Sequence, residues 1–273
     1  MSTYVFSDVH GRYRALIRMM EAISPTSDDK LYMLGDMADR GPNGVKVIQA
    51  CKSLENSVCL MGNHEEILLD CFEHPEDDTR WFMWAQNGSN HTLEGLEKIE
   101  ASEKDEILNW VAHLPFYSYV KIADRYFILT HAGIIPPSKE YVARLLDKYG
   151  AWCDEAIEEL MDSQDEYDLR WVREGYWNKP TNLVDDKGNG PIVVSGHTIT
   201  PYVEPLAYGY NQKAVNEDNQ CQVMFCGACE DTGQVPDKIA IDCGCAAGYP
   251  IGRLACLRLD DMQVFYEEVR EDE

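Results

Sequence analysis

Two carboxylates and one guanidinium follow a short apolar run near the start of the chain. Asp36, Asp39 and Arg40 stand in the segment Gly35 to Gly41, directly after the apolar residues 31–34. The apolar run predicts a strand, so these charged side chains should leave one strand end. Two like charges this close are unfavourable unless a positive group lies beside them. A metal ion or a phosphate-binding arginine would supply that charge.

Similar side chains follow four other apolar runs. Residues 4–6, 58–61, 126–129 and 192–194 precede residue types that bind metals, namely Asp8, His10, Asn63, His64, His131 and His197. Asp8 and Asp36 are 28 positions apart, and Asp36 and Asn63 are 27 apart, which is about one strand-helix-strand unit each time. Because ligands bind at the carboxyl ends of parallel strands, we expect these side chains to converge.

This mixture of ligand types indicates a particular kind of metal site. Carboxylate and amide oxygens together with imidazole nitrogens suit Mn, Fe or Zn better than Ca or Mg. Six such ligands, namely Asp8, His10, Asp36, Asn63, His131 and His197, are too many for one catalytic ion with open positions. They suit two ions about 3.5–4 Å apart that share a bridging carboxylate. We therefore expect two divalent metal ions, with Mn²⁺ favoured and Fe or Zn as alternatives.

The pattern of apolar residues indicates an α/β protein. The first 61 residues alternate between strand and helix patterns, which predicts a parallel sheet. We expect one domain over residues 1–273. Within it we expect a helical segment at 66–118, a helix at 139–160 and an acidic loop or exposed face at 162–168. Towards the end of the chain we expect a long loop at 208–234 and a hairpin of 254–259 with 263–269.

Composition narrows the possible partners. The formal net charge is −24, and a surface this acidic repels nucleic acid and anionic membranes. The sequence contains no apolar run of about 18 residues, so we expect no membrane span. It enters a strand-like segment at once, without a visible export signal, and its ten cysteines are expected to be free thiols in the cytoplasm.

Five of the cysteines could form a second site. Cys221, Cys226 and Cys229 precede the pair Cys243 and Cys245. A Cys-x-x-Cys motif with a later pair can bind a structural zinc ion, but the later pair here is Cys-x-Cys, which is poor spacing. Buried or loop thiols are therefore favoured over zinc.

The motifs at the strand ends resemble those of a known family. In order along the chain they are Asp8-Val9-His10-Gly11, Gly35 to Gly41, Gly62-Asn63-His64-Glu65, His131-Ala132-Gly133 and Gly196-His197-Thr198. Together they resemble the calcineurin-like metallophosphoesterases, specifically the serine/threonine phosphoprotein phosphatase branch with its small bacterial and phage members. The resemblance implies the fold of that family, a β-sandwich flanked by helices in α/β/β/α layers.

The resemblance also implies a metal ligand set. One ion would be bound by Asp8, His10 and Asp36, and the second ion by Asp36, Asn63, His131 and His197. Asp36 would therefore bridge the two ions. A hydroxide held between them would attack phosphorus directly, without a covalent enzyme intermediate.

Four further residues acquire roles through the same resemblance. His64 would be the general acid, and Asp39 would orient it and raise its pKa. Arg40 would hold the phosphate, together with a second arginine in a Trp-x-Arg context that Arg173 matches. Taken alone, Arg40 could instead pair with Asp39, and Arg173 could simply flank a packed tryptophan.

We expect this enzyme to hydrolyse phosphoserine and phosphothreonine in proteins. The alternative within the same fold is a dinucleotide hydrolase of the diadenosine tetraphosphatase type. Such enzymes typically lack the aspartate of the Asp-Arg-Gly triplet and have aspartate in place of Glu65, so Asp39 and Glu65 favour the protein phosphatase. A non-catalytic phosphopeptide-binding protein is disfavoured, because no expected ligand is missing.

Overall fold

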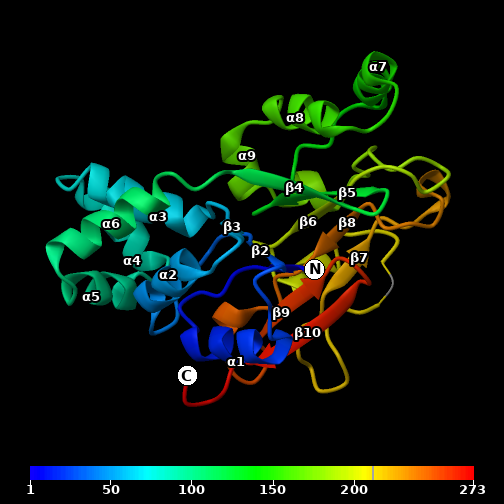
Figure 1. Ribbon diagram of the computed structural model, residues 1–273. Helices are drawn as coiled ribbons and strands as arrows, with labels where there is room; N and C mark the ends of the chain where they lie inside the picture. The colour runs from blue at the N-terminus through cyan, green and yellow to red at the C-terminus, as the bar shows by residue number, and fades with distance from the viewer. Residues whose placement is uncertain (211) are drawn as a thin grey trace. The chain divides into compact units, whose positions relative to one another are not determined.

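The computed structural model describes residues 1–210 and 212–273 (Figure 1). The chain divides into two compact units, one formed by Met1–Pro115 and Cys243–Glu273 and the other by Phe116–Asp242. Each unit contains one five-stranded sheet with both parallel and antiparallel neighbours. The predicted α/β class is therefore confirmed. Residue 211, which falls in the expected loop at 208–234, lies outside the described residues.

The sheet of the first unit has the strand order β10-β9-β1-β2-β3. Its strands are β1 (Thr3–Phe6), β2 (Lys30–Met33), β3 (Ser57–Cys59), β9 (Arg253–Arg258) and β10 (Gln263–Glu268). Strands β1, β2 and β3 are parallel, as predicted, and α1 (Tyr13–Ile23) and α2 (Gly44–Ser53) connect them. The hairpin of β9 and β10 adds to the other side of β1 in antiparallel orientation.

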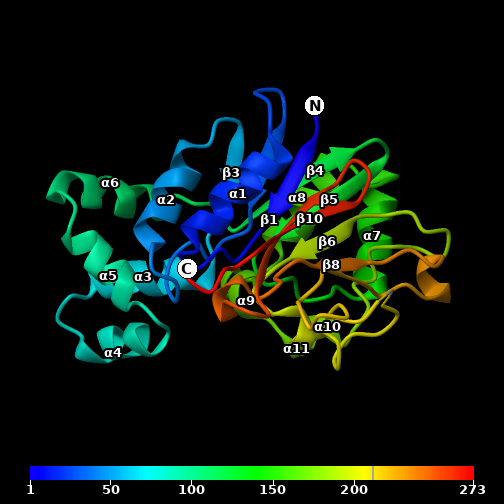
Figure 2. The same cartoon turned by 90° about the horizontal axis from the view of Figure 1, so that it is seen from below.

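Four more helices follow β3 in the first unit. They are α3 (Asn63–Glu73), α4 (Asp78–Gln86), α5 (Asn90–Glu97) and α6 (Ala101–Val111). Both ribbon views show them as a group set apart from the sheet of the same unit (Figures 1 and 2). Because α3 begins directly after β3, Asn63 and His64 form its first turn.

The sheet of the second unit has the order β4-β5-β6-β8-β7. Its strands are β4 (Tyr117–Ile122), β5 (Arg125–Thr130), β6 (Ile192–Ser195), β7 (Met224–Cys226) and β8 (Lys238–Ala240). Strands β5, β6 and β8 are parallel neighbours, and β4 and β7 pair antiparallel at the two edges. The carboxyl ends of β5 and β6 therefore lie next to each other, and His131 and His197 follow them.

The helices of the second unit correct one prediction. They are α7 (Lys139–Tyr149), α8 (Asp154–Asp162), α9 (Glu166–Trp171), α10 (Glu174–Trp177) and α11 (Thr200–Val203). The single helix predicted at 139–160 is wrong, because Gly150 adopts a left-handed φ of 79° and its N–H bonds to the carbonyl of Leu146 at 2.7 Å. The acidic stretch at 162–168 also contains the start of α9.

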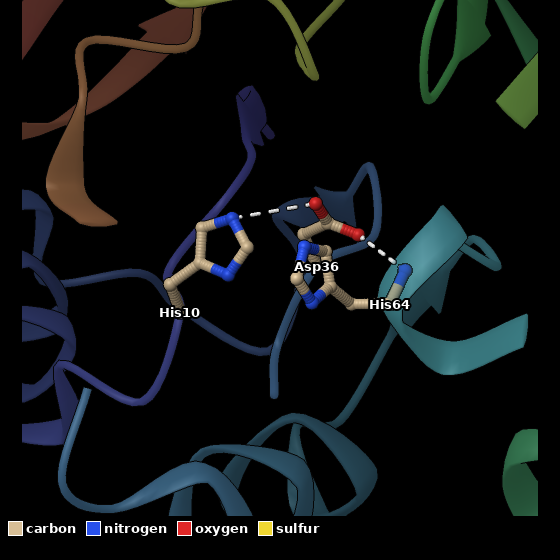
Figure 3. Close-up of side chains that lie close together, drawn as sticks. All are labelled: His10, Asp36 and His64. Carbon is tan, nitrogen blue, oxygen red and sulfur yellow. Dashed lines mark hydrogen bonds and ion pairs between the residues drawn. The ribbon is translucent and has the colours of Figure 1, made fainter. Parts of the chain in front are cut away.

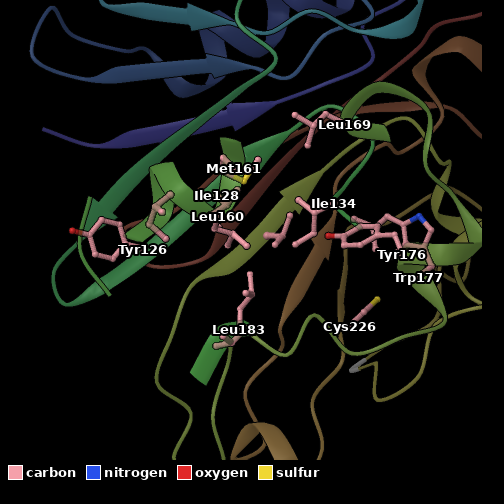
Figure 4. Packing of buried hydrophobic residues seen from close by; sticks show 14 of the residues in the cluster. Tyr126, Ile128, Ile134, Leu160, Met161, Leu169, Tyr176, Trp177, Leu183 and Cys226 are labelled. Carbon is pink, nitrogen blue, oxygen red and sulfur yellow. The ribbon is translucent and has the colours of Figure 1, made fainter. Parts of the chain in front are cut away.

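The second unit has its own apolar core between β5, β6, β8 and the helices α7 to α10 (Figure 4). Tyr176 and Trp177 are among its largest fully buried side chains, and their rings pack 4.6 Å apart. Cys226 lies in the same core, where burial raises the pKa of its thiol to about 12. Such a thiol stays protonated and unreactive at neutral pH.

All ten cysteines are free thiols. Among the described residues, no cysteine belongs to a cluster of potential metal ligands. The structure therefore favours the interpretation of Cys221 to Cys245 as thiols. None of the helices in the described ranges combines the length and the apolar character that a membrane crossing requires.

Candidate active site

The loops that follow β1 and β2 are held together by backbone hydrogen bonds. The N–H of Asp8 donates to the carbonyl of Gly35 at 3.1 Å, and the N–H of His10 donates to the carbonyl of Asp36 at 2.9 Å. The N–H of Gly41, in the loop after β2, donates to the carbonyl of His10 at 3.0 Å. The candidate ligands of the two loops are thereby placed beside each other by main-chain contacts.

Glu65 holds the second of these loops against the start of α3. Its buried carboxylate accepts hydrogen bonds from the N–H groups of Asp36 at 2.7 Å, Met37 at 2.8 Å and Ala38 at 3.2 Å. It also accepts the N–H of Gly62 at 3.1 Å. A side chain at Gly62 would place its Cβ 2.3 Å from Asp36 Oδ1, so only glycine allows this approach.

Unusual backbone conformations gather at the predicted site residues. Six of them have left-handed φ angles without being glycine, namely Asp8 (53°), His10 (45°), Asp36 (59°), Asp39 (66°), Arg40 (63°) and His197 (63°). Such conformations cost about 1–3 kcal/mol each and persist where the surrounding structure enforces them. Their concentration at the strand ends supports a functional role for these residues.

Three side chains of the first unit form a compact group of potential ligands. Ligand atoms of His10, Asp36 and His64 lie within 4.8 Å of one another, and all three residues are buried. Figure 3 shows the carboxylate of Asp36 between the other two residues. Its Oδ2 lies 3.3 Å from His10 Nε2, and its Oδ1 accepts the backbone N–H of His64 at 3.1 Å.

His10 presents a neutral ring whose lone pair is on Nε2. Its Nδ1 is 3.0 Å from the carbonyl of Ala38 and must donate to it, so Nε2 is the acceptor. Burial lowers the pKa of His10 to about 4, against the opposing effect of Asp36. A neutral imidazole whose second nitrogen is held by a carbonyl is the usual form of a metal-ligating histidine.

The guanidinium of Arg40 lies beside the same group. Its Nη1 lies 3.2 Å from His10 Nε2, and its Nη2 lies 3.0 Å from His64 Nε2. Both N–H groups therefore point at lone pairs that a divalent cation could also use. The buried carboxylate and the neutral imidazole fit a metal site.

His64 is fixed by a carboxylate on its other side. Its Nδ1–H donates to Asp39 Oδ2 at 2.8 Å, and both side chains are fully buried. Burial opposes the charged form of the ring, but the carboxylates of Asp36 and Asp39 outweigh it and raise the pKa of His64 above its usual value. This arrangement holds a proton on Nδ1 and leaves Nε2 for proton transfer.

Asp8 and Asn63 lie near this group by sequence and backbone. Asp8 is buried and its Oδ2 accepts a short hydrogen bond from Ser7 Oγ, but Asp8 is not in a ligand cluster of the described residues. Asn63 is 4% exposed and begins α3. Both remain predicted ligands.

The remaining candidates lie in the second unit. His131 Nε2 and His197 Nδ1 are 3.2 Å apart, and their rings meet at 65° with centroids 5.0 Å apart. Arg173 Nη1 donates to the carbonyl of His197 and to Thr198 Oγ1, both at 3.2 Å. The second unit thus brings together two imidazoles and one guanidinium at the ends of β5 and β6.

Three positioning residues were missed by the sequence analysis. Trp84 is fully buried in α4, and its Nε1–H donates to Asp39 Oδ2 at 2.9 Å. Thr92 in α5 accepts the backbone N–H of Asp39 at 2.9 Å. Glu65 was interpreted only as a marker of substrate class. Its place three residues after Gly62 was the available signal, because glutamate there often binds the backbone at a helix start.

Trp84→Phe should remove the hydrogen bond from the indole N–H to Asp39 while keeping an aromatic ring in the core. The change removes one of the two donors to Asp39 Oδ2, and a hydrogen bond to a charged group contributes about 1.5–3 kcal/mol. We expect the free energy of unfolding in urea to fall by that amount. Trp81→Phe on the same helix is the matched control, because Trp81 Nε1 donates to the carbonyl of Pro75 near solvent. Equal losses in both variants would contradict the role of Trp84.

Comparison with known proteins identifies the family. The sequence profile of the family described as calcineurin-like phosphoesterase matches residues 1–227. The chain belongs to this family. The predicted metallophosphoesterase fold is confirmed by the profile and by a solved structure described as a candidate diadenosine tetraphosphatase. That structure matches with a TM-score of 0.58 at 16% identity, covering 99% of this chain and 94% of its own.

Two relatives in the family are similar over nearly their whole length. One from Coxiella burnetii is 27% identical over 92% of this chain and 87% of its own. One from Salmonella paratyphi B is 28% identical over 98% of this chain and 94% of its own. Both are named bis(5′-nucleosyl)-tetraphosphatase, symmetrical.

These relatives overturn two predictions for this phosphoesterase. The prediction of a serine/threonine protein phosphatase is wrong, and so is the prediction of a phosphorylated protein as its partner, because the near full-length relatives are nucleotide tetraphosphatases. The structure explains the error. Asp39 and Glu65, which favoured the phosphatase, hold His64 and the backbone of the 36–38 loop, so neither side chain is placed to read the substrate.

Proposed function

We propose that this phosphoesterase hydrolyses bis(5′-nucleosyl) tetraphosphates symmetrically, releasing two nucleoside diphosphates. The observation that carries the proposal is the similarity of both relatives over nearly the entire chain. The site supports it chemically, because its arginines, imidazoles and carboxylates suit the hydrolysis of a phosphorus–oxygen bond.

The predicted ligands keep their roles in this proposal. Asp8, His10 and Asp36 would hold one divalent cation, and Asp36, Asn63, His131 and His197 would hold the second. Mn²⁺ suits this mixture of oxygen and nitrogen ligands. When bound, the two cations lower the pKa of water and neutralise charge on the phosphoryl group.

The arginines have to overcome the charge of the protein. The net charge of −24 repels a polyphosphate at long range. Arg40 is held by its own backbone, whose N–H donates to the carbonyl of Gly88 at 2.8 Å. Arg173 is held against the loop of His197 and Thr198. Each guanidinium can make paired hydrogen bonds to phosphoryl oxygens, which positions the phosphorus for attack.

His64 assists the departure of the product. Its Nε2 delivers a proton to the oxygen that leaves phosphorus, while Asp39 keeps Nδ1 protonated and fixes the ring. In a tetraphosphate that oxygen belongs to a nucleoside diphosphate, which is a better leaving group than the alkoxide of serine.

The direct test is product analysis with diadenosine tetraphosphate. Purified protein is incubated with Mn²⁺, Zn²⁺ or Mg²⁺, and the products are separated by anion-exchange chromatography. We expect ADP as the sole nucleotide product. Values of kcat/KM for a phosphoserine peptide and for p-nitrophenyl phosphate serve as comparison, and both should be lower by orders of magnitude. Production of ATP with AMP, or a preference for the phosphopeptide, would overturn the proposal.

A further inference from the structure

Helix α9 carries a stacked aromatic pair, and one member of the pair contacts the candidate metal ligand His197. Tyr167 and Trp171 are four positions apart, so their side chains share one face of the helix. Their rings stack with centroids 5.9 Å apart and planes 18° from parallel. The ring of Trp171 meets His197 edge-on, at 6.1 Å and 81°. The three rings therefore form a continuous row that starts at His197.

The outer member of this row is open to solvent. Tyr167 is 59% exposed, which is high for a large aromatic side chain. Stacking on Trp171 restricts its ring, so little conformational freedom remains to be lost when a flat ligand binds. An exposed and restricted aromatic face is the feature on which nucleic acid bases stack.

The charges around the pair favour an uncharged partner. Asp165, Glu166 and Asp168 lie on the same short segment, and no lysine or arginine precedes Arg170 in it. Such surroundings repel phosphate groups. They do not repel a neutral purine ring, whose amino group is itself a hydrogen-bond donor. The row is therefore suited to the base of a nucleotide and not to its phosphates.

The same segment continues directly to the candidate phosphate ligand. Arg173 lies two residues beyond Trp171 and is bonded to the carbonyl of His197 and to Thr198 Oγ1. A nucleotide carries its phosphates at one end and its base at the other, separated by the ribose. The segment from Tyr167 to Arg173 thus contains aromatic rings suited to the base of a nucleotide and a guanidinium suited to its phosphates.

On the basis of the proposed function, we propose that Tyr167 and Trp171 form an adenine platform, on which one base of the dinucleotide stacks against the exposed face of Tyr167. The platform would make purine dinucleotides better substrates than pyrimidine dinucleotides, because the larger ring system overlaps more of the tyrosine. It would contribute to substrate binding and not to the chemical step.

Tyr167→Leu tests the platform, since leucine keeps apolar bulk but cannot stack in the same way. Alanine substitutions put the contribution of base stacking on an aromatic side chain at about 1–3 kcal/mol, which corresponds to about a five- to 150-fold change in affinity. We expect KM for diadenosine tetraphosphate to rise within that range and kcat to stay within about twofold. The preference for diadenosine over diuridine tetraphosphate should shrink by a similar factor. Hydrolysis of p-nitrophenyl phosphate, which has no base, should not change.

Two matched variants separate stacking from structure. Tyr167→Phe keeps the aromatic face and should retain the KM of the original protein. Phe82→Leu changes an aromatic residue that is 61% exposed on α4 and should have no effect on either substrate. If Tyr167→Leu leaves KM for diadenosine tetraphosphate unchanged, or lowers activity equally on both substrates, the platform is refuted while the proposed function stands. If the unmodified protein cleaves p-nitrophenyl phosphate but not the dinucleotide, the proposed function and the platform both fail.

Discussion

Asp36→Asn should reduce kcat by about a thousandfold or more and lower the metal content of the protein. Asp36 lies between His10 and His64 and is the one carboxylate proposed to contact both cations. Asparagine preserves its shape and tolerates the left-handed φ of 59°, so the local backbone should persist. The substitution removes the negative charge, and a catalytic metal contributes several kcal/mol, with 1.36 kcal/mol equal to a factor of ten in rate.

The measurement combines metal analysis of dialysed protein with steady-state rates on diadenosine tetraphosphate. We expect fewer than two bound divalent ions per chain in the variant and an unchanged circular dichroism spectrum. Asp70→Asn is the control, because Asp70 is a carboxylate of α3 that pairs with Arg80 at the surface. Full metal content and full activity in Asp36→Asn would exclude Asp36 as the bridging ligand.

Strands β1 and β6 were predicted because both are buried throughout, and their apolar residues 4–6 and 192–194 form short continuous runs. The short strand β7, by contrast, lies inside the expected loop at 208–234. The pairing between strands could be predicted from the sequence only in part. The hairpin of β9 and β10 was expected, but nothing local in residues 253–268 indicates that β9 joins β1, about 250 positions away in the sequence.

In the candidate site, too, residues that belong to local motifs could be predicted from the sequence, whereas residues that contact them from distant parts of the chain could not. The motifs located His10, Asp36 and His64, since each follows a strand end directly. Trp84 and Thr92 were not found, because they reach Asp39 across 45 and 53 positions and belong to helices without any motif. Contacts of this kind depend on tertiary packing, which a single sequence does not encode in its periodicity.

The class of substrate was the property that the sequence predicted least well, and the reason is physical. The residues that seemed to separate the two functions, Asp39 and Glu65, are both buried and make their hydrogen bonds within the protein. Discrimination between substrates requires side chains that contact the substrate, and the base platform proposed at Tyr167 would be such a position, with no motif at the tyrosine itself. A signature in the catalytic loops therefore identifies the chemistry more securely than the molecule that undergoes it.

His64→Asn should make the reaction depend more strongly on the leaving group. General acids contribute about 10²- to 10⁴-fold when the leaving oxygen is strongly basic, and little when it is weakly basic. We expect kcat/KM to fall by an amount in this range for aryl phosphates with the most basic phenols. The loss should be much smaller for p-nitrophenyl phosphate and for diadenosine tetraphosphate, because the phosphate oxygen of the leaving nucleoside diphosphate is also weakly basic. A plot of log kcat/KM against leaving-group pKa should be steeper for the variant.

This steepening distinguishes proton donation from a general disturbance of the site. Loss of the hydrogen bond to Asp39, or a shift of Asp36 through the backbone N–H of residue 64, would lower all rates by a common factor and leave the slope unchanged. His91→Asn is the matched control, because His91 is an exposed histidine of α5. Parallel plots for His64→Asn and the unmodified protein would assign His64 to metal-site architecture. A steeper plot would leave Nε2 as the proton donor, held in position by Asp39 and, through it, by Trp84.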